Sequence, residues 1–259
     1  MSVDAPNQQS DPLAPVIAAA DQFAKRLEEI RSRVTLPDGL GFYPWVTSIV
    51  NLWCLGQALS GENRTLFSDL RGKRVADIGG ADGEMAFFAE SLGAKADLID
   101  CVATSNNGLH GARAYKRELN SAVEIHDIDL DSQFTLPDRY DLIMLFGILY
   151  HLKNPYFVLE ALSKATGHLL LSTRITAWSA PIDDLDRREL VGPVAWLLEE
   201  GQAGGDPTSY WIFTEAGLRL LLKRTGWRIA DYIIFGDMAT SDPWTLQGDR
   251  RMFCYLKQT

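Results

Sequence analysis

From Arg74 onward, short apolar runs alternate with segments in which apolar residues recur at helical spacing. The apolar runs cover residues 74–78, 96–100, 122–127, 140–146, 168–173, 228–236 and 252–256, and the helical segments cover residues 82–92, 107–119, 154–166 and 214–224. Strands that alternate with helices of this length imply βαβ units around a buried sheet. We therefore predict an α/β fold with a doubly wound, mostly parallel seven-stranded sheet. The last two runs lack an intervening helix, which favours an antiparallel pair at the sheet edge.

The amino-acid composition and net charge indicate which kind of molecule this protein binds. The chain has 259 residues, of which 46% are hydrophobic and 23% charged, as in soluble globular proteins. Its net charge is −9, and no long run of Lys and Arg offsets this value. Because binding to a phosphate backbone depends on clustered cations, we expect a small-molecule substrate and disfavour a broad nucleic-acid surface.

The sequence also bears on location. The three cysteines, Cys54, Cys101 and Cys254, lack metal-site or disulfide-framework spacing, so we predict a reducing compartment and no metal site. The first residues have no basic start and no apolar stretch, so we expect no signal peptide. Residues 39–61 carry no charge, but Pro44 and several polar residues interrupt them, so we predict a packed helix and no membrane span. These features predict a cytoplasmic protein, whereas nothing in the sequence indicates its oligomeric state.

Three regions follow from the pattern along the chain. Residues 1–15 contain three prolines and several polar residues, and are predicted to be a disordered tail. Residues 16–70 are predicted to form an N-terminal helical cap, with helices over 16–34 and 44–59 and Pro44 in the first turn of the second helix. Residues 71–259 form the main domain, in which the insertion (residues 175–211) is a candidate lid.

A glycine-rich turn follows the first predicted strand. Asp77 precedes Gly79, Gly80, Ala81 and Gly83, and a helical segment comes next. Such a turn lets a ligand approach the backbone at the carboxyl edge of the sheet. The spacing lacks the third glycine of a dinucleotide fingerprint, which makes a nicotinamide-dependent reductase the weakest alternative. The acidic residues, including Glu84 at the helix start, favour a cationic ligand over a diphosphate.

Acidic residues also end the next two predicted strands. Asp100 lies about 20 residues beyond the turn, where a carboxylate can accept hydrogen bonds from both hydroxyls of a ribose. Asp127 and Ile128 end the third strand, where an adenine can rest on the apolar side chain and donate its amino group to the carboxylate. Together, these positions predict a site for an adenosine without phosphate.

Over residues 72–173, and more loosely to the C-terminus, these features resemble the class I S-adenosylmethionine-dependent methyltransferases. The resemblance implies a Rossmann-like methyltransferase fold, S-adenosylmethionine as cofactor, and methyl transfer by in-line displacement to an oxygen, nitrogen or carbon atom. It assigns the turn from Gly79 to the methionine end of the cofactor, Asp100 to the ribose, and Asp127 with Ile128 to the adenine. We also assign Phe146, at the end of the fourth strand, to the cofactor pocket. In the family's D-x-G-x-G-x-G pattern, Ala81 replaces the second glycine.

Residues 141–155 have a closer likeness. They are similar to the corresponding stretch of the bacterial enzymes that carboxymethylate the wobble uridine of tRNA with carboxy-S-adenosylmethionine, as are Pro44 and Trp45. Those enzymes carry a lysine after the Pro-Trp pair, and here residues 46–48 are Val, Thr and Ser. We therefore predict ordinary S-adenosylmethionine and a small-molecule acceptor. The tRNA enzyme and a non-catalytic cofactor-binding partner subunit stay as alternatives.

Two residues after the fourth predicted strand are the candidate catalytic groups. A histidine near its unperturbed pKa can accept a proton at neutral pH, so His151 is the candidate base, with Tyr150 beside it. The alternative is that both residues only line the pocket or cap the next helix. Trp178 and Trp211 are candidates to sandwich a flat substrate, or to form a small core in the insertion. Arg250 is a candidate to bind a substrate carboxylate.

Overall fold

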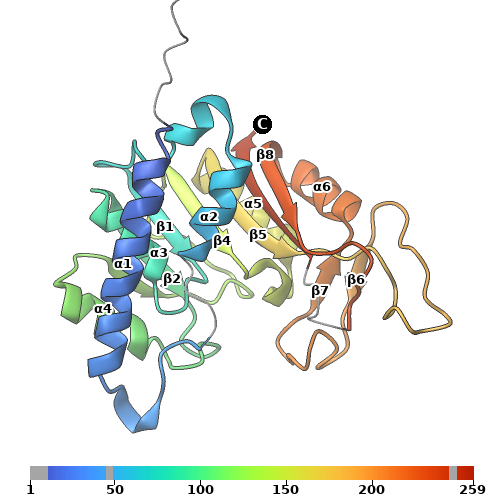
Figure 1. The fold of residues 1–259 in the computed structure, drawn as a ribbon, viewed down its shortest axis with the longest axis horizontal. Helices are drawn as coiled ribbons and strands as arrows, with labels where there is room; N and C mark the ends of the chain where they lie inside the picture. The colour runs from blue at the N-terminus through green and yellow to red at the C-terminus, as the bar shows by residue number, and fades with distance from the viewer. Residues whose placement is uncertain (1–10, 45–48, 245–249) are drawn as a thin grey trace, which may run out of the picture.

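A seven-stranded sheet forms the centre of the molecule (Figure 1). The computed structural model describes residues 11–44, 49–244 and 250–259. The strand order is β3-β2-β1-β4-β5-β9-β8, and the first five of these strands are parallel. Their bounds are β1 (Arg74–Ile78), β2 (Lys95–Asp100), β3 (Glu124–Asp127), β4 (Leu142–Phe146), β5 (His168–Arg174), β8 (Trp227–Phe235) and β9 (Arg251–Gln258). β9 pairs antiparallel with both β5 and β8, which confirms the predicted sheet and its antiparallel edge.

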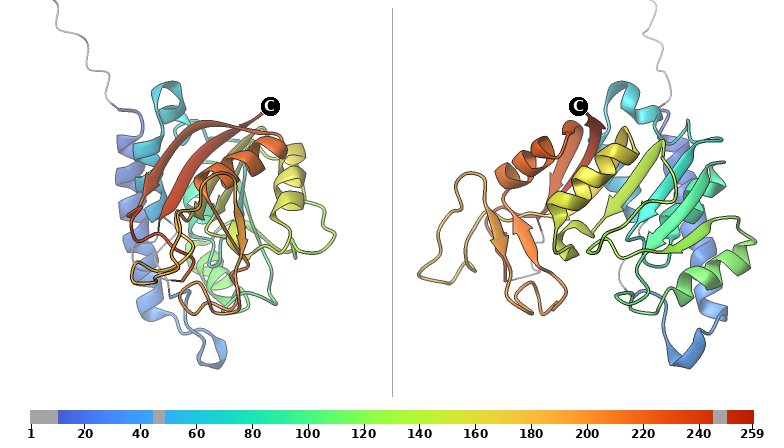
Figure 2. Two further views of the ribbon diagram at one scale, coloured as in Figure 1. Left: turned by 90° about the vertical axis from the view of Figure 1, so that its right-hand side faces the viewer. Right: turned by 180° about the vertical axis from the view of Figure 1, so that it is seen from behind.

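Helices cover both faces of the sheet (Figure 2). One face packs against α1 (Ala14–Arg33), α2 (Val50–Ala58), α3 (Glu84–Ser91) and α4 (His110–Leu119), and the other against α5 (Pro155–Ala165) and α6 (Glu215–Arg224). Neighbouring strand residues alternate between the two cores: Leu98 enters the first and Ile99 the second. This alternation explains why the strands read as continuous apolar runs, because both sides of each strand are buried.

The N-terminal part differs from the prediction in two places. α1 begins at Ala14 because Pro15 suits the first turn of a helix, and Leu13 before it is fully buried, so the predicted tail ends earlier. The second predicted helix was placed over 44–59, but Pro44 lies outside a helix and α2 begins at Val50. The backbone N–H of Tyr43 donates to Asp82 at 2.6 Å, which ties this segment to the glycine-rich turn. Residues 45–48, including Trp45, lie outside the described part of the chain.

Within the ranges that the structure describes, no helix combines the length and apolarity needed to cross a bilayer. The short 3₁₀ helices are η1 (Pro37–Gly39), η2 (Gly61–Thr65) and η3 (Leu149–His151).

The insertion contains a small sheet that its sequence pattern did not predict. β6 (Ala195–Leu197) and β7 (Trp211–Phe213) pair antiparallel, beside the carboxyl end of β5 (Figure 1). Each strand has three residues, too few to show a periodic pattern. Trp196 packs against Leu198, Ala203 and Ile212, so this tryptophan belongs to the insertion's own core. That the insertion acts as a lid stays a prediction.

Thr214 joins the insertion to α6 through its hydroxyl group. Its Oγ1 accepts a hydrogen bond from the backbone N–H of Gly217 at 3.0 Å, as a helix N-cap does, and another from Val194 at 3.0 Å. The same hydroxyl donates to the carbonyl of Gly192 at 2.7 Å. The Thr214 hydroxyl therefore makes hydrogen bonds to backbone groups both at the N-terminal end of α6 and just before β6.

We expect Thr214→Ala to lower the free energy of unfolding by about 1–2 kcal/mol, because it removes the N-cap and leaves partly buried partners without their hydrogen bonds. Thr214→Ser keeps the hydroxyl and serves as the matched control, with a loss well below that of the alanine variant. Urea unfolding followed by circular dichroism measures both values. Equal stability of the two variants would contradict the assigned role.

Candidate active site

The turn between β1 and α3 brings the backbone close to buried acidic groups. Gly79 and Gly83 have positive φ angles of 67° and 80°, which glycine adopts without steric cost. A Cβ atom on Gly80 would lie 2.3 Å from Oδ2 of Asp77. The glycines at these positions therefore permit a close approach that a larger residue would prevent.

Ala81 takes the backbone conformation that its neighbouring glycines favour. Its φ angle is 52°, in the left-handed region, and its N–H donates to Oδ2 of Asp100 at 2.8 Å. Ala81 therefore adopts a conformation that is uncommon for a residue with a side chain, at the position where the motif has a glycine. This hydrogen bond also joins the end of β1 to the end of β2.

Three carboxyl groups around the turn are buried. Asp77 accepts a hydrogen bond from the backbone N–H of Ala86 at 3.2 Å, and burial raises the pKa of Asp77 to about 7. Asp82 and Glu84 are also buried, and Arg31 from α1 faces both, at 3.7 and 3.1 Å. The sequence pattern did not predict this role for Arg31, because it lies 53 residues from Glu84 and within an ordinary amphipathic helix.

The structure brings the predicted adenosine residues together at the ends of β2 and β3. The carboxylate of Asp100 also accepts from the N–H of Cys101 at 2.7 Å, and burial raises the pKa of Asp100 to about 6. The backbone N–H of Ile128 donates to the carbonyl of Asp100 at 2.9 Å. Asp127 accepts from the N–H of Val102 at 2.8 Å. Asp100, Asp127 and Ile128 therefore lie along one continuous edge of the sheet.

Phe146 lies at the same edge, one strand away. It ends β4, the strand that pairs with β1 on the side opposite β2, and its side chain is partly buried against the first core. Its assignment to the cofactor pocket stays a prediction.

Tyr43 links the N-terminal segment to the opposite side of the site. Its backbone bonds Asp82, as described above, while burial and the nearby Tyr150, Asp206 and Asp100 raise the pKa of its hydroxyl group. The Tyr43 hydroxyl therefore feels the charge of Asp100 at the end of β2 and of Asp206 in the insertion. A single tyrosine in a loop gives no sequence signal for this placement.

Tyr150 and His151 form part of η3 and contact the insertion. Their rings lie 4.3 Å apart, and the carbonyl of Tyr150 accepts from the N–H of Tyr210 at 2.8 Å. Nδ1 of His151 lies 3.0 Å from the carbonyl oxygen of Thr208. Burial lowers the pKa of His151, so the ring is neutral at pH 7.

The predicted substrate residues are divided between two regions. Trp211 lies beside η3 and donates from Nε1 to the carbonyl of Lys153 at 3.3 Å. Trp178 instead donates to the carbonyl of Met238 at 2.9 Å. Arg250 faces Glu215 of α6 at 3.8 Å, whereas its neighbour Arg251 lies 3.5 Å from the hydroxyl of Tyr150. The substrate roles of Trp178, Trp211 and Arg250 stay predictions, and Arg251 is the arginine of the pair that reaches η3.

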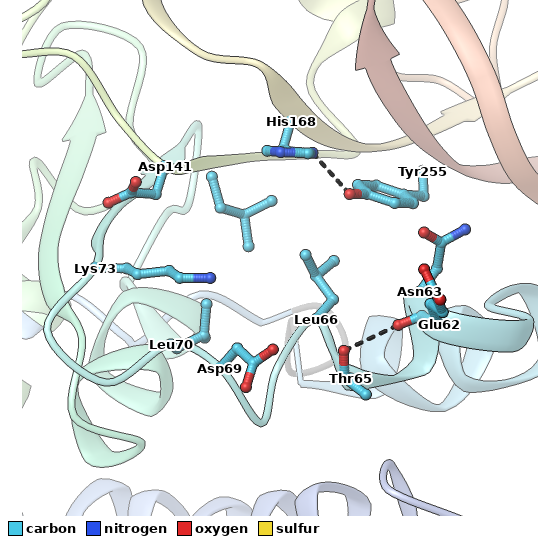
Figure 3. Close-up of a pocket in the computed structure, with 11 residues that line it drawn as sticks. Glu62, Asn63, Thr65, Leu66, Asp69, Leu70, Lys73, Asp141, His168 and Tyr255 are labelled. Carbon is cyan, nitrogen blue, oxygen red and sulfur yellow. Dashed lines mark hydrogen bonds between the residues drawn. The ribbon is translucent and has the colours of Figure 1, made fainter.

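A pocket at the opposite edge of the sheet contains polar groups of mixed charge (Figure 3). The side chain of His168, where β5 begins, shares a hydrogen bond of 2.7 Å with the hydroxyl of Tyr255. Lys73, Asp69 and Asp141 also line this pocket. Because these residues precede or begin their strands, the pocket is separate from the site at the carboxyl edge.

Among the described residues, Asp97, Glu124 and His126 also place possible metal ligands within 4.8 Å of one another. Asp97 accepts a hydrogen bond from Tyr140 at 2.7 Å and pairs with Arg74 at 3.2 Å. Since the buried carboxylate already has a cationic partner, this cluster is explained by the packing of the strand edges.

The glycine-rich turn and the strand-end acids suit a nucleoside with a cationic tail. A diphosphate in the turn would face Asp82 and Glu84, and the Arg31 guanidinium that could offset them already pairs with Glu84. The carboxylate of Asp100 at the end of β2 provides an acceptor for ribose hydroxyls. The donor and acceptor groups present therefore fit S-adenosylmethionine better than a dinucleotide.

Solved structures share this fold. An S-adenosylmethionine-dependent methyltransferase from Mesorhizobium loti is 18% identical, with a TM-score of 0.56 over 73% of this chain and 93% of that chain. A putative S-adenosylmethionine-dependent methyltransferase from Listeria monocytogenes is 17% identical, with a TM-score of 0.53 over 74% and 93%. Magnesium protoporphyrin IX methyltransferase from Synechocystis, solved with bound S-adenosylhomocysteine, is 15% identical, with a TM-score of 0.50 over 98% and 90%.

Comparison with curated protein sequences finds no match. The methyltransferase domain family, in contrast, matches residues 56–232, which include the glycine-rich turn, the ends of β2 and β3, η3 and the insertion. This match covers more than half of the chain, and the chain therefore belongs to the methyltransferase domain family.

Proposed function

We propose that this protein transfers a methyl group from S-adenosylmethionine to a small-molecule acceptor. The observation that carries the proposal is the arrangement of the turn after β1: the Ala81–Asp100 hydrogen bond joins two strand ends, and the buried acids Asp82 and Glu84 disfavour a diphosphate there. The methyltransferase domain match supports the same reaction class.

In this proposal, one set of residues binds the cofactor and another set orients the acceptor. When bound, S-adenosylmethionine supplies a methyl group on a positively charged sulfur that a nucleophile attacks in line. Asp100 binds the ribose, Asp127 and Ile128 bind the adenine, and Gly79 with its neighbours leaves room for the amino-acid tail. Alignment of two reactants in one site contributes several kcal/mol to such a displacement. In this proposal, Tyr150 and His151 orient the acceptor, and His151 deprotonates it.

The net charge of −9 and the position of the insertion beside η3 support a small acceptor. One observation favours the alternative, a tRNA wobble-uridine enzyme that uses carboxy-S-adenosylmethionine: the Arg251 guanidinium next to Tyr150 could bind the additional carboxylate. Mass spectrometry of the nucleoside that copurifies with the protein separates the two, because the carboxylated cofactor is heavier. Detection of that heavier compound would replace the small-molecule proposal with the alternative.

We expect Asp100→Asn to weaken the binding of S-adenosylhomocysteine at least tenfold, which corresponds to a loss of about 1.4 kcal/mol. An amide cannot accept from the N–H groups of both Ala81 and Cys101, and it presents a donor to the ribose hydroxyls. Isothermal titration calorimetry measures the change. Asp183→Asn, in an exposed part of the insertion, is the charge-matched control and should bind as the wild type does. Equal affinity of the Asp100 variant and the wild type would count against this ribose site.

The affinity for S-adenosylhomocysteine should fall as the pH is lowered through about 6. The raised pKa of Asp100 means that its carboxyl group holds a proton at pH 5, and the ribose hydroxyls need the deprotonated form as acceptor. From pH 7.5 to 5 we expect a loss of about tenfold, since roughly one molecule in ten keeps the carboxylate at pH 5. Titrations across this range test it. A flat profile in the wild type, or an equally steep one in Asp100→Asn, would be the contrary result.

A further inference from the structure

The imidazole of His151 is held by the insertion. Its Nδ1 lies 3.0 Å from the carbonyl oxygen of Thr208 and 3.1 Å from Oγ1 of the same residue. Oδ2 of Asp206 lies 3.8 Å from Nδ1. All three neighbouring atoms are oxygens of a segment that lies more than 50 residues away in the sequence.

These contacts decide which ring nitrogen carries the proton. The carbonyl oxygen of Thr208 can only accept a hydrogen bond, so Nδ1 must donate. The hydroxyl of Thr208 gives its own proton to Oδ1 of Asp206 at 2.6 Å, and it too faces Nδ1 as an acceptor. Both neighbours therefore require a proton on Nδ1, which leaves the lone pair on Nε2.

Asp206 organises the segment that makes these contacts. Its carboxylate accepts from the N–H of Thr208 at 2.8 Å and from the hydroxyl of Ser209 at 2.9 Å. The N–H of Tyr210 then donates to the carbonyl of Tyr150, which fixes the segment against η3. The carboxylate of Asp206 also lies 3.8 Å from Nδ1, where its negative charge would stabilise a protonated imidazole.

Charged groups from three elements face His151. Burial has the largest effect and lowers the pKa of His151, and Arg251 of β9 and Arg174 of β5 lower it further, while the hydrogen bond to Thr208 and the charge of Asp206 raise it. The ring is therefore neutral at pH 7, with part of its surface exposed. Within the described residues, Nδ1 makes all the hydrogen bonds of this side chain, so Nε2 has no hydrogen-bond partner there, and the side chain is 25% exposed.

We propose that Asp206 and Thr208 are positioning residues that hold His151 with its proton on Nδ1, so that Nε2 accepts the proton of an O–H or N–H acceptor during methyl transfer. The proposal rests on the proposed function. It gives the insertion a chemical role, because the insertion fixes the form of the catalytic base.

The proton balance of the step is complete with these groups. The acceptor atom forms a bond to the methyl carbon, the carbon–sulfur bond breaks with its electron pair on sulfur, and the acceptor's proton passes to Nε2 of His151. Asp206 then faces an imidazolium ion. An acceptor that reacts as an anion, such as a carboxylate, would gain nothing from this arrangement.

The test is nitrogen-15 NMR of the imidazole rings in the 259-residue chain, whose four histidines make assignment simple. The signal missing in His151→Gln identifies His151. At pH values above the pKa of His151, where the ring carries a single proton, we expect that proton on Nδ1 in the wild type. Free histidine favours the proton on Nε2, so the two forms are distinct.

Two substitutions of Asp206 separate its roles. Asp206→Asn keeps an oxygen that can accept from Thr208 but removes the charge, so the tautomer should persist while the pKa of His151 falls. Asp206→Ala removes the acceptors that hold Thr208 and Ser209, so the carbonyl oxygen of Thr208 is no longer fixed beside Nδ1 and we expect mixed tautomers. Asp183→Asn, which removes an exposed charge elsewhere in the insertion, should leave both the tautomer and the pKa of His151 unchanged. If the alanine variant does not fold, the asparagine variant alone decides.

A wild-type ring protonated on Nε2, or a His151 pKa that is the same in Asp206→Asn, would overturn the positioning role. Titration of the same samples with S-adenosylhomocysteine tests the proposed function independently. Absence of binding together with the expected tautomer would reject the methyl-transfer proposal, whereas normal binding with the other tautomer would reject only the role of Asp206 and Thr208.

Discussion

The site depends on carboxyl groups that are buried at the ends of neighbouring strands and satisfied by backbone N–H groups. Asp77 accepts from Ala86 at the start of α3, and Asp100 accepts from Ala81 in the turn. Burial of a carboxylate is unfavourable unless hydrogen bonds compensate for it, so these bonds fix the course of the turn. Burial raises the pKa values of Asp77 and Asp100 although backbone hydrogen bonds lower them, so these hydrogen bonds offset only part of the cost of burying the charge. A ligand with hydroxyl donors and a positive charge would complete it.

Segments from both ends of the chain converge on this edge. From the N-terminal side, Arg31 neutralises Glu84 and Tyr43 reaches over the turn. From the C-terminal side, Thr208 of the insertion contacts His151 on η3. The sheet supplies the strand-end acids, while the N-terminal segment adds Tyr43 next to Asp82 and the insertion adds Thr208 next to His151. This division agrees with the general rule that function in a common fold resides in what is attached to it.

The sequence predicts the sheet well because strands buried on both faces give continuous apolar runs, and because an acid at the end of a strand keeps its place at the sheet edge. Asp100, Asp127 and Ile128 therefore come together as predicted. β6 and β7 were missed, since three residues show no period. The contact of Arg31 with Glu84 depends on how α1 packs, which no local pattern encodes.

The choice between Arg250 and Arg251 shows the same limit on a finer scale. Successive residues of a strand point to opposite faces. β9 begins at Arg251, which pairs with Arg174 of β5, and Arg250 lies just before the strand, where its carbonyl accepts from the N–H of Ile175 at 2.8 Å; this register sets where each arginine side chain lies. A shift by one residue would exchange them, and the sequence alone does not fix that register.

The central claim is that the turn after β1 holds an adenosine joined to a cationic sulfur and not to a diphosphate. Competitive titration calorimetry of the wild-type protein with S-adenosylmethionine and NAD⁺ tests it most directly, since both ligands carry the same nucleoside. We expect saturable binding of S-adenosylmethionine that an excess of NAD⁺ does not reduce. Binding of NAD⁺ with no binding of S-adenosylmethionine would contradict it.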